Sequence, residues 1–190
     1  SIISVFVKII VVIFILHILL LLVQFVLAGI IGRKNPLRLL KNMLPAYATA
    51  LGTQSSAATI PVTLAQTIKN GVSKNIATFV IPLCATIHLS GSTMKITACA
   101  MAIMMMSGMP INTTDFSGFI LMLGITMVAA PGVPGGTVMA SLGLITSVLG
   151  FGDTGTALML TIFALQDSFG TACNVTGDGA LTLILTGYAE

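Results

Sequence analysis

Residues 11–31 read VVIFILHILLLLVQFVLAGII, and this stretch decides the class of fold. It supplies the roughly 20 apolar residues that a helix needs to cross a bilayer, interrupted by His17 and Gln24. The rest of the chain agrees, because 56% of its 190 residues are hydrophobic and 7% are charged. A soluble domain carries about 25% charged residues. We therefore predict an all-α integral membrane protein, with residues 9–32 as its first transmembrane helix.

Positive charge follows directly after this helix. Half of the eight Lys and Arg residues lie within the nine residues 33–41. Such a cluster at a membrane exit is typical of a cytoplasmic loop, so we expect a multi-pass protein of the plasma (inner) membrane with residues 33–41 inside the cell. A net charge of +3 without Trp argues against a nucleic-acid partner and leaves the lipid bilayer as the expected one.

Two later stretches are uncharged over most of their length but interrupted by polar or turn-forming residues. Residues 42–70 hold TQSSAAT, and residues 116–152 hold PGVPGG. In each case two half-length helices fit better than one span, with the first pair meeting at Ser55 and Ser56. We predict two re-entrant helical hairpins, which require protein or water to satisfy the freed backbone groups.

Each predicted hairpin is followed by a long apolar segment. Residues 76–108 hold TIHLSGST at positions 86–93, which indicates a broken transmembrane helix, and residues 155–188 form the last transmembrane helix. A hairpin followed by a span therefore occurs twice, and one crossing between the two hairpins makes the units inverted. Interrupted segments at corresponding positions of two halves are the usual pointer to a transporter binding site.

Polar residues in the last helix give the strongest single signal. Asp167, Thr171, Asn174 and Asp178 fall within roughly 60° of helical arc. A carboxylate at the membrane centre costs on the order of 3 kcal/mol or more, so these side chains are expected to face a cavity or a partner. Hydrogen bonding between helices would explain the Thr and Asn but not two aspartates. An ammonium group or a hard cation such as sodium is the natural ligand.

Four further features bear on function. Ser55 and Ser56 lie at a turn whose helix end leaves backbone donors for a carboxylate. PGVPGG suits a mobile gate and lacks the Lys of a phosphate loop. His88 could carry a proton or donate a hydrogen bond. Lys95 could snorkel, pair with an acid or face the cavity.

No nucleophile with a neighbouring base is evident, so we expect no enzymatic activity. The three cysteines are interpreted as small hydrophobic residues.

Several motifs together resemble the dicarboxylate/amino acid:cation symporter family, which has the glutamate transporter fold. They are SSAATIPVT after KNMLPAYATALGT, then PLCATIHLSGS, APGVPGG and LQDSFGTACNVTGDG. The resemblance implies that residues 1–190 are a portion of the mobile transport domain, with the scaffold domain absent. It also implies a homotrimer when full length and an elevator-type alternating access.

The resemblance assigns roles to individual residues. The two hairpin tips would hold the carboxylate of the substrate, Asp167 its amino group and Thr171 its polar end, while sodium would bind near Asn174 and Asp178. The implied substrate-binding residues are Ser55, Ser56, Gly132, Val133, Asp167, Gly170, Thr171 and Asn174. The implied cation-binding residues are His88, Ser90, Asn174 and Asp178.

Departures from the family pattern bear on the substrate. Gly170 stands where members with acidic substrates have an arginine, so we expect no cation there, and Gln54 replaces another arginine found in some members. The sequence His88–Ser92 replaces Asn-Met-Asp-Gly-Thr, which removes an amide and a carboxylate from the usual sodium sites. We predict a cation-coupled symporter for small neutral amino acids resembling serine or threonine, with sodium as the coupling ion, protons as the alternative one and no other cofactor.

Two alternatives remain open from the sequence. One is a symporter of acidic amino acids or dicarboxylates, coupled to sodium or protons. The other belongs to a different class, namely a non-transporting, truncated membrane subunit in which the motifs only pack.

Overall fold

The computed structural model describes residues 2–189, with side-chain surroundings for residues 6–187, and within these residues it contains helices and no strand. The helices are α1 (Ile2–Ile31), α2 (Pro36–Thr53), α3 (Ser56–Lys69), α4 (Lys74–Ile87), α5 (Ser90–Met106), α6 (Thr113–Val128), α7 (Gly136–Ser147) and α8 (Asp153–Ala189). This agrees with the predicted all-α class.

The first helical pair, α2 and α3, begins earlier than predicted. Asn35 adopts an extended conformation, and its side-chain oxygen accepts hydrogen bonds from the backbone N–H groups of Leu37 and Arg38. Pro36 occupies the first helical turn, where its missing N–H is tolerated. The helix therefore starts at Pro36 rather than at residue 42. Most of the predicted loop 33–41 is helical, and this boundary was wrong.

The remaining elements lie close to their predicted positions. The predicted broken span consists of α4 and α5, separated at His88 and Leu89. The second helical pair, α6 and α7, covers 113–147 rather than 116–152, and α8 covers 153–189 rather than 155–188. The interruptions at TQSSAAT and PGVPGG are real breaks between helices.

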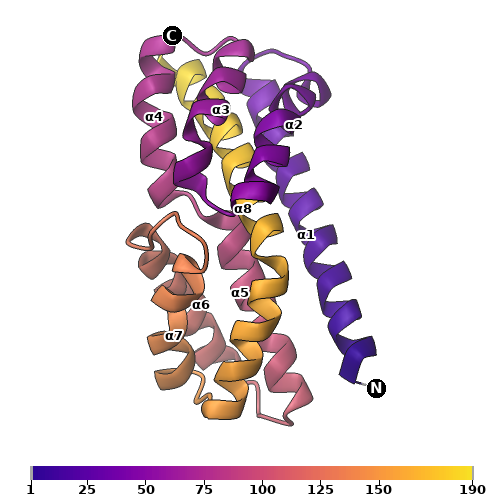
Figure 1. The fold of residues 1–190 in the computed structure, drawn as a ribbon. Coiled ribbons are helices and arrows are strands. Elements are labelled where there is room, and N and C mark those ends of the chain that lie inside the picture. Colours follow the sequence, from indigo (N-terminus) through magenta and orange to yellow (C-terminus); the bar gives the residue numbers. More distant parts are fainter. Residues whose placement is uncertain (1, 190) are drawn as a thin grey trace.

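The two helical pairs point toward each other along the axis of α8 (Figure 1). The base of α2–α3 lies at the end of the molecule that holds the C-terminus, and the base of α6–α7 lies at the opposite end. Their connecting segments, the first tip (Gln54–Ser55) and the second tip (Ala129–Gly135), meet at mid-height beside the break between α4 and α5. Three interruptions of helix thus gather around the middle of α8.

Two separate apolar cores hold this arrangement together. One includes Ile13, Ile96, Phe119 and Phe163, from α1, α5, α6 and α8, with further residues from α7. The other is built from α1, α2, α4 and the C-terminal half of α8, and contains Phe25 and Met43. The mid-height region lies between the cores, which leaves it to polar side chains.

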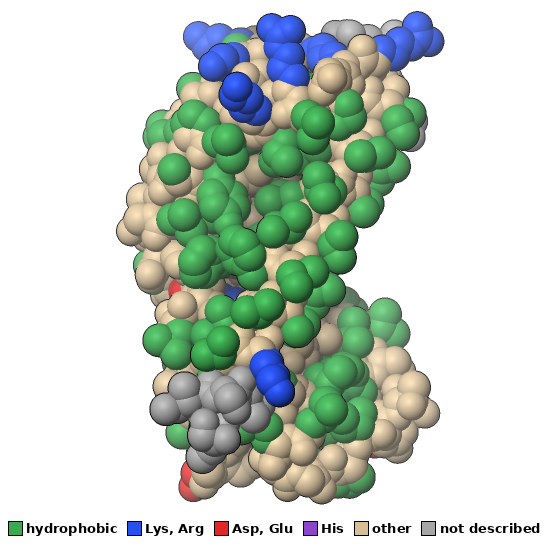
Figure 2. Space-filling view, turned by 90° about the vertical axis from the view of Figure 1, so that its right-hand side faces the viewer, with side chains coloured by type: hydrophobic (Ala, Val, Ile, Leu, Met, Phe, Trp, Pro, Cys, Tyr) green, Lys and Arg blue, Asp and Glu red, His purple; other side chains and the backbone are tan. Residues whose placement is uncertain are grey.

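Helix lengths indicate how the molecule fits a bilayer. Within the described residues, two stretches are long and apolar enough to cross it, Phe6–Ile31 and Lys74–Met106, the second containing the break. Apolar side chains of α1 are exposed along one face, as expected for lipid contact, and Figure 2 shows them below a rim of Lys and Arg. In contrast, α6 and α7 have 16 and 12 residues. These lengths correspond to about 24 and 18 Å, less than the ~30 Å hydrocarbon core.

Candidate functional site

A small polar cavity, here called the central cavity, lies between the two tips and α8. Its volume is about 10 Å³, which is roughly enough for one water molecule. The lining residues come from both tips, the start of α5, α7 and α8: Gln54, Ser56, Leu89, Ser92, Pro131, Gly132, Val133, Thr137, Asp167, Thr171 and Asn174. In this conformation the two tips therefore close the site.

The tips are bonded directly to each other. The Ser55 hydroxyl donates to the carbonyl oxygen of Gly132 at 2.8 Å, and the backbone N–H of Ala57 donates to the same oxygen at 3.2 Å. Ser55 also caps α3, because its Oγ accepts from the N–H of Ala58. A Cβ atom on Gly132 would lie 2.6 Å from the carbonyl oxygen of Ala85, so only glycine permits this approach.

Asp167 connects α8 to the second tip and to α5. Its Oδ2 accepts a hydrogen bond from the backbone N–H of Gly135 at 2.7 Å, and its Oδ1 lies 3.2 Å from Nζ of Lys95. Gly135 has φ +72° and precedes the first turn of α7, a backbone conformation that favours glycine. The carboxylate therefore holds the second tip while being paired with a buried cation.

Asn174 caps α5 from across the site. Its Oδ1 accepts from the backbone N–H groups of Gly91 and Ser92 at 2.8 and 3.3 Å, and its Nδ2 donates to the Ser92 hydroxyl at 2.9 Å. Leu89, at the N-cap position of α5, makes no side-chain cap. The amide of Asn174 satisfies donors that a helix start inside the protein would otherwise leave free.

His88 and Asp178 form a second cluster one turn further along α8. Nδ1 of His88 lies 2.8 Å from Oδ1 of Asp178, and Nε2 lies 2.9 Å from the Ser90 hydroxyl and 3.3 Å from Nε2 of Gln24. These partners fit an imidazole that donates from Nδ1 and accepts at Nε2, as assigned from the bonding pattern. The side-chain oxygen of Gln24 is buried without a hydrogen-bond partner among the described residues. The cluster therefore offers carboxylate, hydroxyl and amide oxygens.

The predicted site residues divide into three groups by position. Lining the central cavity are Ser56, Gly132, Val133, Asp167, Thr171 and Asn174, while Ser55 bonds the tips together. His88, Ser90 and Asp178 belong to the second cluster. Gly170 lies behind the cavity, where a Cβ atom would meet Nζ of Lys95 at 3.1 Å.

Two findings at the site were not predicted. Lys95 reaches Gly170 from α5, behind the central cavity and not in its lining, so the expectation that Gly170 leaves no cation for a substrate's side-chain carboxylate stays a prediction. Gln24 and Thr137 are also site residues that the sequence reading missed. Gln24 could have been predicted, because it is a polar residue in an otherwise apolar span. Thr137 could not, because nothing in the sequence distinguishes it from the other hydroxyl residues.

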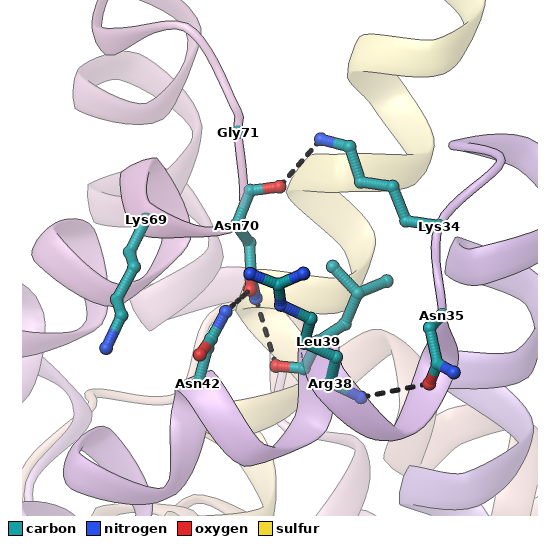
Figure 3. Close-up of a pocket in the computed structure, with 8 residues that line it drawn as sticks. All are labelled: Lys34, Asn35, Arg38, Leu39, Asn42, Lys69, Asn70 and Gly71. Atoms are coloured by element: carbon teal, nitrogen blue, oxygen red, sulfur yellow. Dashed lines mark hydrogen bonds between the residues drawn. The ribbon is translucent and has the colours of Figure 1, made fainter.

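A larger cleft lies elsewhere, at the base of the first helical pair. Its volume is about 470 Å³, and its lining includes Lys34, Arg38 and Lys69. Figure 3 shows Lys34 bonded to the backbone oxygen of Asn70, whose side chain bonds Asn42 and the carbonyl of Leu39. The cleft belongs to the basic rim of the molecule and is separate from the central cavity.

The fold brings two helix-connecting tips together over a polar centre in the middle of α8. The chain matches the sodium:dicarboxylate symporter family over residues 1–188, and it belongs to this family. The predicted family is thereby confirmed. Members of the family are transporters rather than enzymes.

Named relatives include transporters of two kinds. Neutral amino acid transporter B(0) of Rattus norvegicus is 31% identical over 159 residues, covering 83% of this chain and 28% of the rat protein. Excitatory amino acid transporter 2 of Homo sapiens is 31% identical, covering 78% and 26%, and human neutral amino acid transporter A is 32% identical, covering 77% and 27%. The chain thus spans about a quarter of the length of these relatives.

Proposed function

We propose that this chain is the substrate-binding part of a sodium-coupled symporter of small neutral amino acids. The observation that carries the proposal is the meeting of both tips with Asp167 over a closed polar cavity. A carboxylate suits the amino group of a substrate, and the tips supply hydroxyl and backbone groups for its carboxylate. Membership of a symporter family and the named relatives support this assignment.

The proposed preference for neutral substrates follows from the charges at the cavity. Among the described residues lining it, Asp167 is the only one with an ionisable side chain. An acidic substrate would bring a second carboxylate without a cation in direct contact with it. A zwitterionic substrate would place its ammonium at Asp167, its carboxylate at the tips and a small polar side chain near Thr171.

The proposed sodium site lies around the second cluster. Asp178 and Ser90 provide hard oxygen atoms on the two sides of the His88 ring, beside the break between α4 and α5. Gln24 contacts the same ring through its Nε2, and its side-chain oxygen has no hydrogen-bond partner among the described residues. Sodium is transported cargo here, so its binding need only be transient. Protonation of His88 is the alternative source of coupling, since His88 contacts the same carboxylate.

The proposed mechanism is an elevator-type alternating access in a homotrimer. The remainder of a full-length protein would supply the scaffold. The basic rim would face the cytoplasm of the plasma membrane, with α2–α3 re-entering from that side and α6–α7 from the other. The short helices of both pairs and their tip-to-tip contact support re-entrance and the inverted relation of the two halves.

Thermal stability of the full-length protein tests substrate and cation together. Serine, threonine, alanine, aspartate, glutamate and succinate are each added in sodium chloride and in choline chloride. A ligand at 100 times its Kd stabilises by about 2.7 kcal/mol. We expect an increase in Tm with the neutral amino acids, in sodium only.

Other outcomes of the same measurement are informative. Stabilisation by aspartate, glutamate or succinate alone would replace the neutral assignment by the acidic alternative. Equal stabilisation in choline would contradict sodium coupling. No stabilisation by any ligand, with no uptake into proteoliposomes, would favour the non-transporting subunit.

A further inference from the structure

Lys95 is a fully buried ammonium group in the second turn of α5. Its exposed fraction is 0%, and it ranks among the largest completely buried side chains of the described residues. An unpaired charge at such depth is strongly unfavourable, so the surroundings of this side chain need an explanation. Neither the residue roles that the family resemblance implies nor the proposed substrate contacts involve Lys95.

The contacts of Nζ account for its burial. The ammonium lies 3.2 Å from Oδ1 of Asp167, donates to the carbonyl oxygen of Gln166 at 3.4 Å and stands 3.3 Å from the ring centroid of Phe163. A carboxylate, a carbonyl and an aromatic face together suit a desolvated cation. All three partners belong to α8, so Lys95 fixes α5 to α8 directly behind the cavity.

Gly170 leaves the space that Lys95 occupies. A Cβ atom at this position would lie 3.1 Å from Nζ and 3.3 Å from Cε of Lys95. Both distances are tighter than ordinary contact, so a side chain there would require the ammonium of Lys95 to shift by a few tenths of an ångström. The glycine and the lysine thus form a matched pair on facing helices.

Lys95 acts on the cavity through Asp167 and does not line it. The two oxygens of the carboxylate have different partners, because Oδ1 faces Lys95 and Oδ2 faces the N–H of Gly135. Opening of the second tip would release Oδ2 toward the cavity and leave Oδ1 paired with Lys95.

We propose that Lys95 is a built-in counter-cation of Asp167 that makes the site select substrates without net charge. The inference rests on the proposed function. The ion pair has zero net charge, and a zwitterion bound at Oδ2 keeps it at zero. An anionic substrate would leave one negative charge unbalanced, and a cationic substrate one positive charge. Lys95 is therefore a positioning residue that sets the charge preference of the site.

Binding of a size-matched charge series to the full-length protein tests this role. The ligands are L-serine, L-aspartate and L-β-aminoalanine, in which an ammonium replaces the serine hydroxyl, each measured by calorimetric titration at mildly acidic pH. We expect the unmodified protein to prefer serine. In Lys95→Met, serine affinity falls at least about tenfold, because the buried partner charge is lost. The preference moves toward the cationic ligand.

Two further variants separate charge selection from simple packing. Lys95→Arg keeps the charge and should keep serine as the preferred ligand. Gly170→Ala should displace the ammonium and shift the preference in the same direction as Lys95→Met, by several-fold. Gly143→Ala is the matched control, since it is also a helical glycine but its Cβ would meet nothing within 4 Å. We expect no change in binding from it.

The result that overturns the inference is a ligand ranking that Lys95→Met and Gly170→Ala both leave unchanged. Should Lys95→Met fail to fold, as judged by gel filtration and ligand-free Tm, Gly170→Ala decides alone. Failure of the proposed function looks different, because the unmodified protein would then bind none of the three amino acids, and the inference would fall with it.

Discussion

At the scale of single residues, the amide of Asn174 joins two helices that are far apart in sequence. It holds the first turn of α5 through two backbone N–H groups, while its own backbone belongs to the uninterrupted α8. The break in the α4–α5 span is therefore tolerated because another helix supplies the missing cap. This bond also fixes Ser92 in the wall of the central cavity.

Removing this cap should destabilise the protein measurably. In Asn174→Ala, the N–H groups of Gly91 and Ser92 lose their acceptor inside the protein, and each buried unsatisfied donor costs about 1–3 kcal/mol. We expect a loss of about 2 kcal/mol or more, seen as a lower Tm without ligand. Thr161→Ala is the control, because that exposed hydroxyl bonds only to Ala157 within its own helix. Equal Tm values for both variants would contradict the capping role.

The residue-scale site was predicted in part. The aligned spacing of Asp167, Thr171 and Asn174 was readable because one helix carries all three, and they do line one cavity. The partner of Lys95 could not be predicted from the sequence. Lys95 and Asp167 are 72 positions apart, and three interpretations of Lys95 were equally compatible with the sequence. Contacts between helices depend on how the helices pack, and no local pattern encodes that.

At the scale of elements, the second tip is held closed by few bonds. The Gly132 carbonyl accepts from Ser55 and Ala57, and the Gly135 N–H donates to Asp167. Val133 projects from the middle of this segment and is half exposed. A segment without regular structure between two short helices has little else to fix it, which suits a gate.

Weakening the bond between the tips should expose the second tip further. Ser55→Ala removes a hydrogen bond of about 1 kcal/mol, so a thiol at Ala130→Cys, a buried position of the second tip, should react roughly fivefold faster with a maleimide. The native cysteines are buried and should contribute little background. Ser147→Ala is the control, because its exposed hydroxyl bonds only to Gly143 in α7. A maleimide reaction rate equal to that of the control would argue against a role of the Ser55 hydroxyl in holding the second tip closed.

The breaks between helices were predicted correctly, but one helix start that is marked by a capping residue was missed. Glycine, proline and hydroxyl residues marked both tips and the break at His88 correctly. The start of α2 was missed because the basic cluster was interpreted as a loop, although Asn35 followed by Pro36 is a helix-start signal. A cluster of Lys and Arg residues indicates on which side of the membrane a segment lies, but it does not indicate that the segment lacks helical structure.

At the scale of the whole molecule, charge is distributed along the long axis. Apart from Lys8, near the start of α1, the exposed Lys and Arg residues gather at the base of the first helical pair (Figure 2). The exposed acidic residues Asp115 and Asp153 lie at the start of α6 and α8, at the base of the second pair. The basic end agrees with the proposed cytoplasmic side, whereas acidic residues contribute little to the orientation of a membrane protein.

Accessibility from each side of the membrane tests this orientation. An impermeant thiol reagent should label Lys41→Cys from the cytoplasmic side only and Asp153→Cys from the outer side only. Both positions are exposed in the structure, so neither requires a conformational change. Labelling of both from the same side would contradict the inverted arrangement of the two pairs.

The bonds that close the second tip also limit how tightly the protein can appear to bind. Three hydrogen bonds of about 1 kcal/mol each, lost together, would keep the open form at on the order of 1% of molecules. A ligand that enters only the open form then shows an apparent Kd about 100-fold above its intrinsic value. If the proposed substrate enters only the open form, its affinity would depend as much on the rarity of that conformation as on the contacts made inside the site.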